Sequence, residues 1–448
     1  MEWCKLLDGQ RLGYNELYSE QADRPSYIQD YDRILFSAPF RRLANKTQVH
    51  PLYENDHLHH RLIHSLETAS VGRSLGIGVG AWLEERNEIE KGERHRVAGV
   101  VQAACLAHDI GNPPFGHSGE DAIGQWFKYK IAEKKGIFLD LPVEFHEELS
   151  NFEGNAQGFR IINQLEMYRN DGGMRLSKSV IASFVKYPVT AEMRGNFINS
   201  QEYCGLKKFG IFKSEFKIFE KVFSSIEIPC VSEAGNKYWR RHPLAFLVEA
   251  ADDICYKILD VEDGFTSGDF SYDQVSDMLL PLAGIEDFCQ KYPEQNEGEK
   301  IAILRAVAIN KSIKSCIDVF KENYDEIIDG RFSLSLIDAS SVSDFFRNIT
   351  DNSNKKLFTS KRKVELEVFG RNVIHGILNG LLPIYEDYIN NNCNEDSMSS
   401  YCRQLKKAVA VDLRDVRDSY SACRSICDYV SGMTDRYAVK VAKMLMVS

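Results

Sequence analysis

Apolar residues recur at intervals of three and four along most of this chain, which is the spacing of one buried face of an α-helix. The clearest run consists of Val97, Val100, Val101, Ala104 and Cys105. This helix is predicted to end at Gly111, because Pro113 and Pro114 cannot continue it. Strict alternation of apolar and polar residues, the pattern of strands, is sparse.

A second helix is predicted to begin at Pro243, a residue type that favours the first helical turn. Its buried face consists of Leu244, Leu247, Ala251, Ile254 and Ile258. Similar spacing predicts helices over residues 57–86, 118–135, 154–168, 300–327, 363–392 and 414–447. Residues 187–240 are less regular and are expected to form a small hairpin or long loops. The pattern therefore predicts an all-α fold.

Composition adds the expectation of one large helical domain over residues 1–448. The chain has 448 residues, of which 44% are hydrophobic and 27% are charged, as in an ordinary globular protein. The polar connectors at 264–273 and 390–400 do not have the composition of flexible interdomain linkers. No apolar run approaches the roughly 18 residues of a spanning helix, so no membrane association is expected.

The cysteines and the net charge restrict the expected location and partners. Eleven cysteines are scattered without a CxxC pair, and the chain starts without a signal-peptide pattern. These features predict reduced thiols and a cytoplasmic protein. A formal net charge of -10 argues against a dedicated nucleic-acid binder, although it does not exclude a local basic patch.

The most informative polar residues are His108 and Asp109, at the end of the first predicted helix. His108 continues the apolar face of that helix, so its imidazole is expected to point inward. An imidazole nitrogen and a carboxylate oxygen directed at one point suit Mn, Fe, Co, Ni or Zn. His64 and Asp252 are further candidate ligands. Asp252 lies beside an apolar helix face, where a carboxylate is costly unless it is paired or bound to metal.

Each of these features also has a purely structural interpretation. A single buried histidine is usually a core residue, and a His-Asp dipeptide occurs by chance in many chains. A pair such as Asp252-Asp253 inside a helix is more often a solvated edge or a cap. His60 and His64 have the i, i+4 spacing of a zinc pair, but no HExxH motif accompanies them. Taken alone, these residues leave the metal site open.

The order of His64, His108-Asp109 and Asp252 resembles the H…HD…D signature of the HD superfamily. Longer strings resemble the bacterial deoxyguanosinetriphosphate triphosphohydrolase (dGTPase) family: RRLANKTQV at 41–49, RLIHSLE at 61–67, HDIGNPPFGH at 108–117, NFEGNAQG at 151–158 and DYVSGMTD at 428–435. They occur in the family's order along nearly the whole chain. One departure is Asn151, because a histidine often stands at this place in the family.

The resemblance implies an HD-domain helical metallohydrolase core at about residues 57–265 and a C-terminal helical extension at about 266–448. It implies that the metal ligands of a divalent ion (Mg, Mn or Co) are His64, His108, Asp109 and Asp252. It also implies a catalytic pair in which His117 transfers a proton and Glu120 orients it. Alternatively, Glu120 is a first-turn charge that complements the helix dipole.

The resemblance further implies contacts to a triphosphate. Arg61, Lys186 and Lys208 match residues that contact phosphates in the family, although a lone lysine is usually a solvated surface charge. Asn155 and Tyr187 complete the expected substrate contacts on this side.

Contacts to the sugar are implied in the same way. Tyr256 and Asp260 follow Asp252 at one and two helical turns, so all three are expected to line one pocket. Tyr256 would pack under the sugar where a 2′-hydroxyl would sit, and Asp260 with Gln48 would bind the 3′-hydroxyl.

The implied activity is metal-dependent hydrolysis of deoxynucleoside triphosphates, with dGTP preferred, at the α-phosphorus, giving a deoxynucleoside and inorganic triphosphate. One alternative is another HD phosphohydrolase, acting as a nucleotidase or phosphodiesterase, which would not be expected to carry the longer strings. The second is a non-catalytic HD protein that senses nucleotides or DNA.

Two further partners are expected. Relatives are commonly hexamers or tetramers, so a homo-oligomer is predicted. The stretch KKLFTSKRK at 355–363 is rich in cations. It is either a solvated loop or helix start, or a binding segment for an effector nucleotide or single-stranded DNA.

Overall fold

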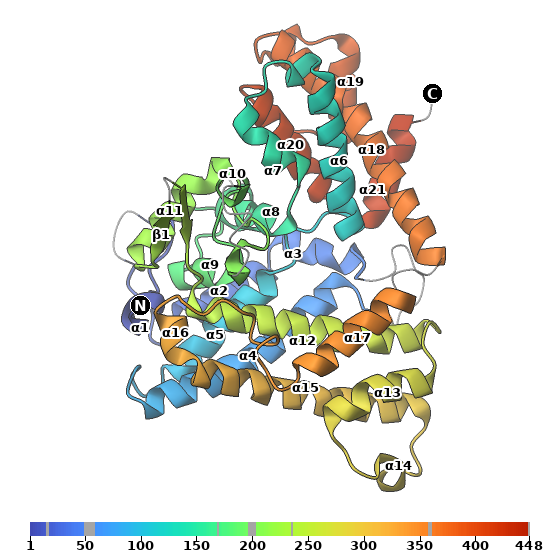
Figure 1. Ribbon diagram of the computed structural model, residues 1–448. Helices are drawn as coiled ribbons and strands as arrows, with labels where there is room; N and C mark the ends of the chain where they lie inside the picture. The colour runs from blue at the N-terminus through green and yellow to red at the C-terminus, as the bar shows by residue number, and fades with distance from the viewer. Residues whose placement is uncertain are drawn as a thin grey trace.

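The computed structural model describes residues 1–14, 18–48, 59–167, 170–195, 203–233, 236–356 and 361–446. These residues form helices and one two-stranded sheet, so the predicted all-α fold is confirmed. The molecule is elongated, with the C-terminal helices at one end and α13 (Tyr272–Ala283) and α14 (Phe288–Lys291) at the other (Figure 1). No described helix has both the length and the apolar character that a membrane span requires.

The other elements are, in chain order, α1 (Trp3–Leu6), α2 (Ser26–Leu35), α3 (Ala38–Arg42), α4 (Arg61–Glu85), α5 (Arg94–Ala107), α6 (His117–Glu133), α7 (His146–Ser150), α8 (Gly154–Arg160), α9 (Lys178–Phe184), α10 (Ala191–Gly195), α11 (Phe216–Ser225), β1 (Cys230–Glu233), β2 (Asn236–Trp239), α12 (Pro243–Thr266), α15 (Glu297–Glu322), α16 (Tyr324–Ile328), α17 (Ser343–Lys356), α18 (Lys361–Asn390), α19 (Ser400–Val409), α20 (Ser419–Ser431) and α21 (Asp435–Met446).

Helices α4, α5 and α12 build the layer that carries most of the candidate site. α4 packs along α5, and α12 packs against both of them, with α15 on the far side of α4 and α12. Glycines on α4 permit the close approach of α5. A Cβ at Gly76 would lie 2.6 Å from the Cα of Ala98, and a Cβ at Gly72 would lie 2.5 Å from the Sγ of Cys105. The two helices therefore pack almost backbone to backbone.

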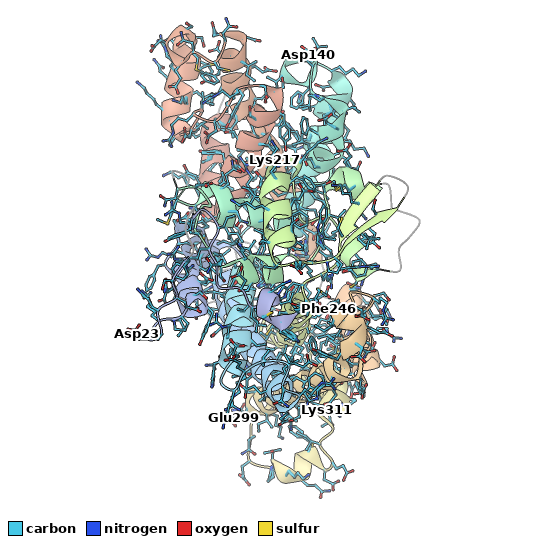
Figure 2. The ribbon with its side chains drawn as sticks, turned by 90° about the vertical axis from the view of Figure 1, so that its left-hand side faces the viewer. Asp23, Asp140, Lys217, Phe246, Glu299 and Lys311 are labelled. Atoms are coloured by element: carbon cyan, nitrogen blue, oxygen red, sulfur yellow. The ribbon has the colours of Figure 1, made fainter. Side chains whose placement is uncertain are left out.

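A second group of helices lies on the other side of the site. α18 packs against α6, α19, α20 and α21. A partly buried ion pair joins this group to α8, because Arg160 of α8 contacts the carboxylate of Asp428 on α20 at 2.8 Å. Figure 2 shows the two groups from the side, with Asp140 near one end of the molecule and Glu299 and Lys311 near the other.

The hairpin expected within residues 187–240 is confirmed. β1 and β2 pair antiparallel, with Cys230 opposite Trp239. The Trp239 ring packs against Phe216 and Phe219 of α11, at centroid distances of 5.7 and 5.1 Å, which anchors the hairpin to the body. The rest of the region contains the short helices α10 and α11 rather than loops alone.

Some predicted helix bounds are wrong. The helix expected over 414–447 is two helices, α20 and α21, because the chain leaves the helix near Gly432 and Thr434 starts the next one. The Thr434 hydroxyl oxygen accepts the Tyr437 amide at 3.2 Å, as an N-cap does. The helix expected to reach Gly111 ends at Ala107, so the following residues form a turn.

Candidate active site

Three chain segments bring the predicted ligands together. His64 lies in the first turn of α4, His108 and Asp109 lie in the turn after α5, and Asp252 lies in the middle of α12. The turn after α5 is pressed against the start of α8, since a Cβ at Gly111 would lie 2.1 Å from the carbonyl oxygen of Gly154. Only glycine fits there.

The four side chains converge on one point. The Oδ1 atom of Asp252 lies 3.3 Å from His64 Nε2 and 3.4 Å from His108 Nε2. His108 Nε2 lies 3.5 Å from Asp109 Oδ1. Ligand atoms of His64, His108 and Asp109 all lie within 4.8 Å of one another. The side chains expected to be ligands are thus neighbours.

The donor set fits a divalent cation. His108 Nδ1 bonds the carbonyl oxygen of Cys105 at 2.7 Å, while its Nε2 is buried and has no hydrogen-bond partner among the described residues. Burial opposes the charge of His108, but the carboxylates of Asp109 and Asp252 outweigh it and raise the pKa of His108 to about 9. The carboxylates attract positive charge to this point, and two imidazoles with two carboxylates suit a divalent ion such as Mn or Co.

Asp109 is held by two further side chains. Arg61 Nη1 donates to its Oδ2 at 2.7 Å, and Asn112 Nδ2 donates to its Oδ1 at 2.5 Å. Burial raises the pKa of Asp109, but the charges of Arg61 and His108 outweigh it and lower this pKa to about 2. Asp109 is therefore an oriented carboxylate that stays ionised.

His117 and Glu120 form a hydrogen-bonded pair in the first turn of α6. His117 Nδ1 lies 2.7 Å from Glu120 Oε2, and the Gly154 amide donates to Glu120 Oε1 at 2.7 Å. The His117 side chain is 75% exposed, whereas that of Glu120 is 9% exposed. The hydrogen bond to Glu120 raises the pKa of His117. An exposed imidazole backed by a buried carboxylate is arranged for proton transfer.

Three cations line the same region. Arg61 is described above, Lys186 Nζ lies 3.5 Å from Asp252 Oδ2, and Lys208 Nζ lies 3.1 Å from Glu153 Oε2. Burial, followed by the charge of Glu120, raises the pKa of Glu153 to about 7. Each cation thus sits beside an acidic group at the wall of the site.

These groups surround a single cavity of about 520 Å³. Of the residues expected in the site, those that line the cavity are Gln48, Arg61, His64, His108, Asp109, His117, Glu120, Asn155, Lys186, Tyr187, Lys208, Asp252 and Tyr256. Asp260 does not line it: only 3% of the residue is exposed, and its Oδ2 has no hydrogen-bond partner among the described residues. The expectation that Asp252, Tyr256 and Asp260 share the cavity wall thus holds for the first two.

Sequence reasoning missed part of the cavity wall. Asn354 of α17 and Lys363 and Glu367 of α18 also line it. The Lys363 side chain is 13% exposed and lies 3.8 Å from Glu367, whereas the Lys361 side chain is 91% exposed. The basic stretch 355–363 is therefore not one solvated segment. Residues 357–360 lie outside the described chain, and binding of DNA or an effector nucleotide to this stretch stays a prediction.

Two family models match the chain. The HD domain matches residues 61–175, which include His64, His108 and Asp109. The phosphohydrolase-associated domain matches residues 395–444, which form α19, α20 and most of α21. Asp252 and α18 lie outside both matched ranges.

Curated relatives align over almost the entire chain. A deoxyguanosinetriphosphate triphosphohydrolase-like protein of Synechocystis is 36% identical over 447 residues, covering 99% of each chain. One of the same name from Pseudomonas aeruginosa is 36% identical over 458 residues, covering 99% of this chain and 98% of the relative. A deoxyguanosinetriphosphate triphosphohydrolase of Salmonella schwarzengrund is 29% identical over 489 residues, covering 94% and 93%. The chain belongs to the deoxyguanosinetriphosphate triphosphohydrolase-like family and is a hydrolase with an HD domain.

Proposed function

We propose that this enzyme hydrolyses deoxynucleoside triphosphates, with dGTP preferred, at the α-phosphorus and releases a deoxynucleoside and inorganic triphosphate. The observation that carries the proposal is the convergence, on one cavity of about 520 Å³, of a metal-binding donor set, a His–Glu pair and four cationic side chains, those of Arg61, Lys186, Lys208 and Lys363. The names of the aligned relatives support the same substrate class.

The donor set comprises His64, His108, Asp109 and Asp252. A divalent ion held there would polarise a phosphoryl oxygen as a Lewis acid. Mg, Mn and Co are the candidates. Arg61 and Asn112 keep the Asp109 carboxylate oriented.

Hydrolysis requires a proton for the departing oxygen. Water adds to the α-phosphorus and releases a proton to solvent, the bond from phosphorus to the 5′-oxygen breaks, and the 5′-oxygen takes a proton. We assign the proton to His117, whose Nδ1 is engaged by Glu120 and whose Nε2 is left for the substrate. Glu120 in turn is fixed by the Gly154 amide, so it orients the imidazole.

Binding of the triphosphate is assigned to the cations of the wall. Arg61 presents a planar fork, while Lys186 and Lys208 are flexible point charges that can follow a polyphosphate. Asn155 and Tyr187 lie beside them at the same wall. In an acidic protein, these cations are the groups of the cavity wall that can pair with the charges of a triphosphate.

Sugar recognition is assigned to the α12 side of the cavity. The Tyr256 ring would occupy the space of a 2′-hydroxyl. Gln48 Oε1 and Asp260 Oδ2 are both buried and lack partners among the described residues, so each has an acceptor left for a hydroxyl group. A 3′-hydroxyl would satisfy them only if the Asp260 carboxylate turned toward the cavity, since it does not line the wall.

Product analysis tests the proposal. The protein is incubated with each dNTP, singly and in mixtures, with Mn(II), Mg(II) or Co(II), and the phosphorus products are identified. We expect inorganic triphosphate, most rapidly from dGTP, and at least about a hundredfold loss of kcat in H117A. Release of orthophosphate alone would favour another HD phosphohydrolase. Nucleotide binding without turnover in any metal would favour a nucleotide sensor.

A further inference from the structure

Two buried polar side chains, of Lys46 and Asp435, join the C-terminal helices to the loops of the active site. Lys46, of which 2% is exposed, donates to the carbonyl oxygens of Asn112 at 2.5 Å and Ser431 at 2.7 Å. Asp435, also 2% exposed, is the first residue of α21. We call the contacts of Lys46 and Asp435 the C-terminal clasp.

The Asp435 carboxylate holds two separate loops. Its Oδ2 accepts the Thr47 amide at 3.0 Å and the Thr47 hydroxyl at 2.7 Å. Its Oδ1 accepts the Phe115 amide at 3.0 Å. Both loops lie more than 300 residues from Asp435 in the sequence, since the separations are 388 and 320. One side chain therefore accepts hydrogen bonds from both loops.

Each of these loops lies next to a residue of the candidate active site. Thr47 immediately precedes Gln48, and Phe115 lies two residues before His117. Phe115 and Gly116 both have positive φ, at 65° and 59°, a conformation that is unfavourable for a residue with a side chain. The hydrogen bond from the Phe115 amide to Asp435 stabilises this turn. The turn directly precedes α6, whose first residue is His117.

The other arm of the clasp supports the metal-binding turn. Lys46 Nζ donates to the carbonyl oxygen of Asn112, whose side chain donates to Asp109. Burying an ammonium and a carboxylate is costly unless hydrogen bonds compensate. Here Lys46 and Asp435 form hydrogen bonds mainly with backbone groups of loops that surround the cavity, and not with each other.

We propose that Asp435 and Lys46 are positioning residues, through which the phosphohydrolase-associated region sets Gln48 and His117 in the active site. The assignment of roles to Gln48 and His117 rests on the proposed function. The clasp itself does not.

The first test measures hydrogen–deuterium exchange, which needs no turnover. In D435N one carboxylate oxygen is replaced by an amide donor, which cannot accept from an N–H group. We expect faster exchange in peptides covering 43–48 and 111–117, and an unchanged rate in D412N, a control in the same region whose exposed side chain pairs with Arg414. Wild-type exchange at both peptides in D435N would overturn the proposal.

The second test compares kcat/KM for dGTP and 2′,3′-dideoxyGTP. A folding defect lowers both values equally and leaves their ratio unchanged. Displacement of Gln48 lowers the ratio of the dGTP value to the dideoxyGTP value, and we expect this ratio to fall about tenfold in D435N. We also expect a lower kcat, because His117 is displaced as well. Mn(II) binding should stay close to wild type, because none of the four ligands is altered.

T47V keeps the proposal testable if D435N does not fold. It removes only the hydroxyl donor to Asp435, so we expect a lower dGTP to dideoxyGTP ratio with little change in exchange at 111–117. A wild-type ratio in T47V and D435N would refute the positioning role. If the wild-type enzyme hydrolyses no dNTP, the proposed function fails, and the exchange experiment still decides whether the clasp exists.

Discussion

At the scale of single residues, the site depends on charges that are buried but individually satisfied. Asp109 is held by Arg61 and Asn112, and Glu120 is held by His117 and the Gly154 amide. Side chains oriented in this way lose little freedom when a substrate binds, which is how a site is preorganised.

The His117–Glu120 pair predicts a specific pH dependence. Glu120 raises the pKa of His117, so the protonated imidazole persists to higher pH than that of an isolated histidine. E120Q keeps an acceptor for Gly154 but removes the charge, so the pKa of His117 falls. We expect the alkaline limb of the kcat profile to move to lower pH, with kcat reduced at least about tenfold. E133Q, an exposed residue of the same helix, is the control. An unmoved alkaline limb in E120Q would contradict the assignment of His117 as the acid.

Tyr256 predicts the choice between deoxyribose and ribose. If its ring fills the space of a 2′-hydroxyl, Y256A should admit GTP and lower the dGTP to GTP ratio of kcat/KM by about tenfold or more. Y129A removes an exposed ring of α6 and should leave the ratio unchanged. Equal use of dGTP and GTP by the wild-type enzyme would remove this role from Tyr256.

At the scale of elements, the close contact of α4 and α5 positions His64 relative to His108 and Asp109. A Cβ at Gly76 would lie 2.6 Å from the Ala98 Cα, a backbone atom that cannot move alone. We expect G76A to lower the free energy of unfolding by about 1–3 kcal/mol, seen as a lower urea midpoint.

The matched control for G76A is G298A, in the first turn of α15. Its nearest neighbour outside the helix would be Asn296 Oδ1 at 3.4 Å. Alanine there should leave the midpoint unchanged or raise it slightly, because alanine favours helix over glycine. Equal midpoints for G76A and the wild type would show that α4 and α5 can separate without cost.

Some of the helix ends can be predicted from the sequence. Ser271 and Gln274 form a capping box at the start of α13, although residues 264–273 were expected to be a connector. By contrast, Asp435, the first residue of α21, accepts the Phe115 amide, which is 320 residues away in the sequence. Local patterns report caps, but they do not report a contact that spans hundreds of residues.

At the scale of the whole molecule, the donor set joins α4, the turn after α5 and α12. A ligand that binds only the folded state stabilises it, by about 2.7 kcal/mol when its concentration is a hundred times Kd. We expect Mn(II) to raise the Tm of chelator-treated protein, and D252N to lose this increase. D277N, an exposed carboxylate of α13, should retain it. A Tm that does not respond to Mn(II) in the wild type would argue against a metal site here.

The assembly and the cellular location of the whole molecule stay predictions. All eleven cysteines lie in the described parts of the chain and are free thiols. The expected homo-oligomer, the cytoplasmic location and the single-domain organisation over 1–448 each need their own measurement.

The sequence by itself determined the helical fold and the identity of the chemical groups. Periodic apolar positions specify which face of a helix is buried, and strings such as HDIGNPPFGH carry the ligands and the turn that presents them. Only the tertiary structure decided which faces meet, because hydrophobic burial is not directional and does not select a partner. For that reason the residue pattern could not predict three features of the structure. Asp260 does not line the cavity, whereas Lys363 does. Asp435 accepts hydrogen bonds from Thr47 and Phe115.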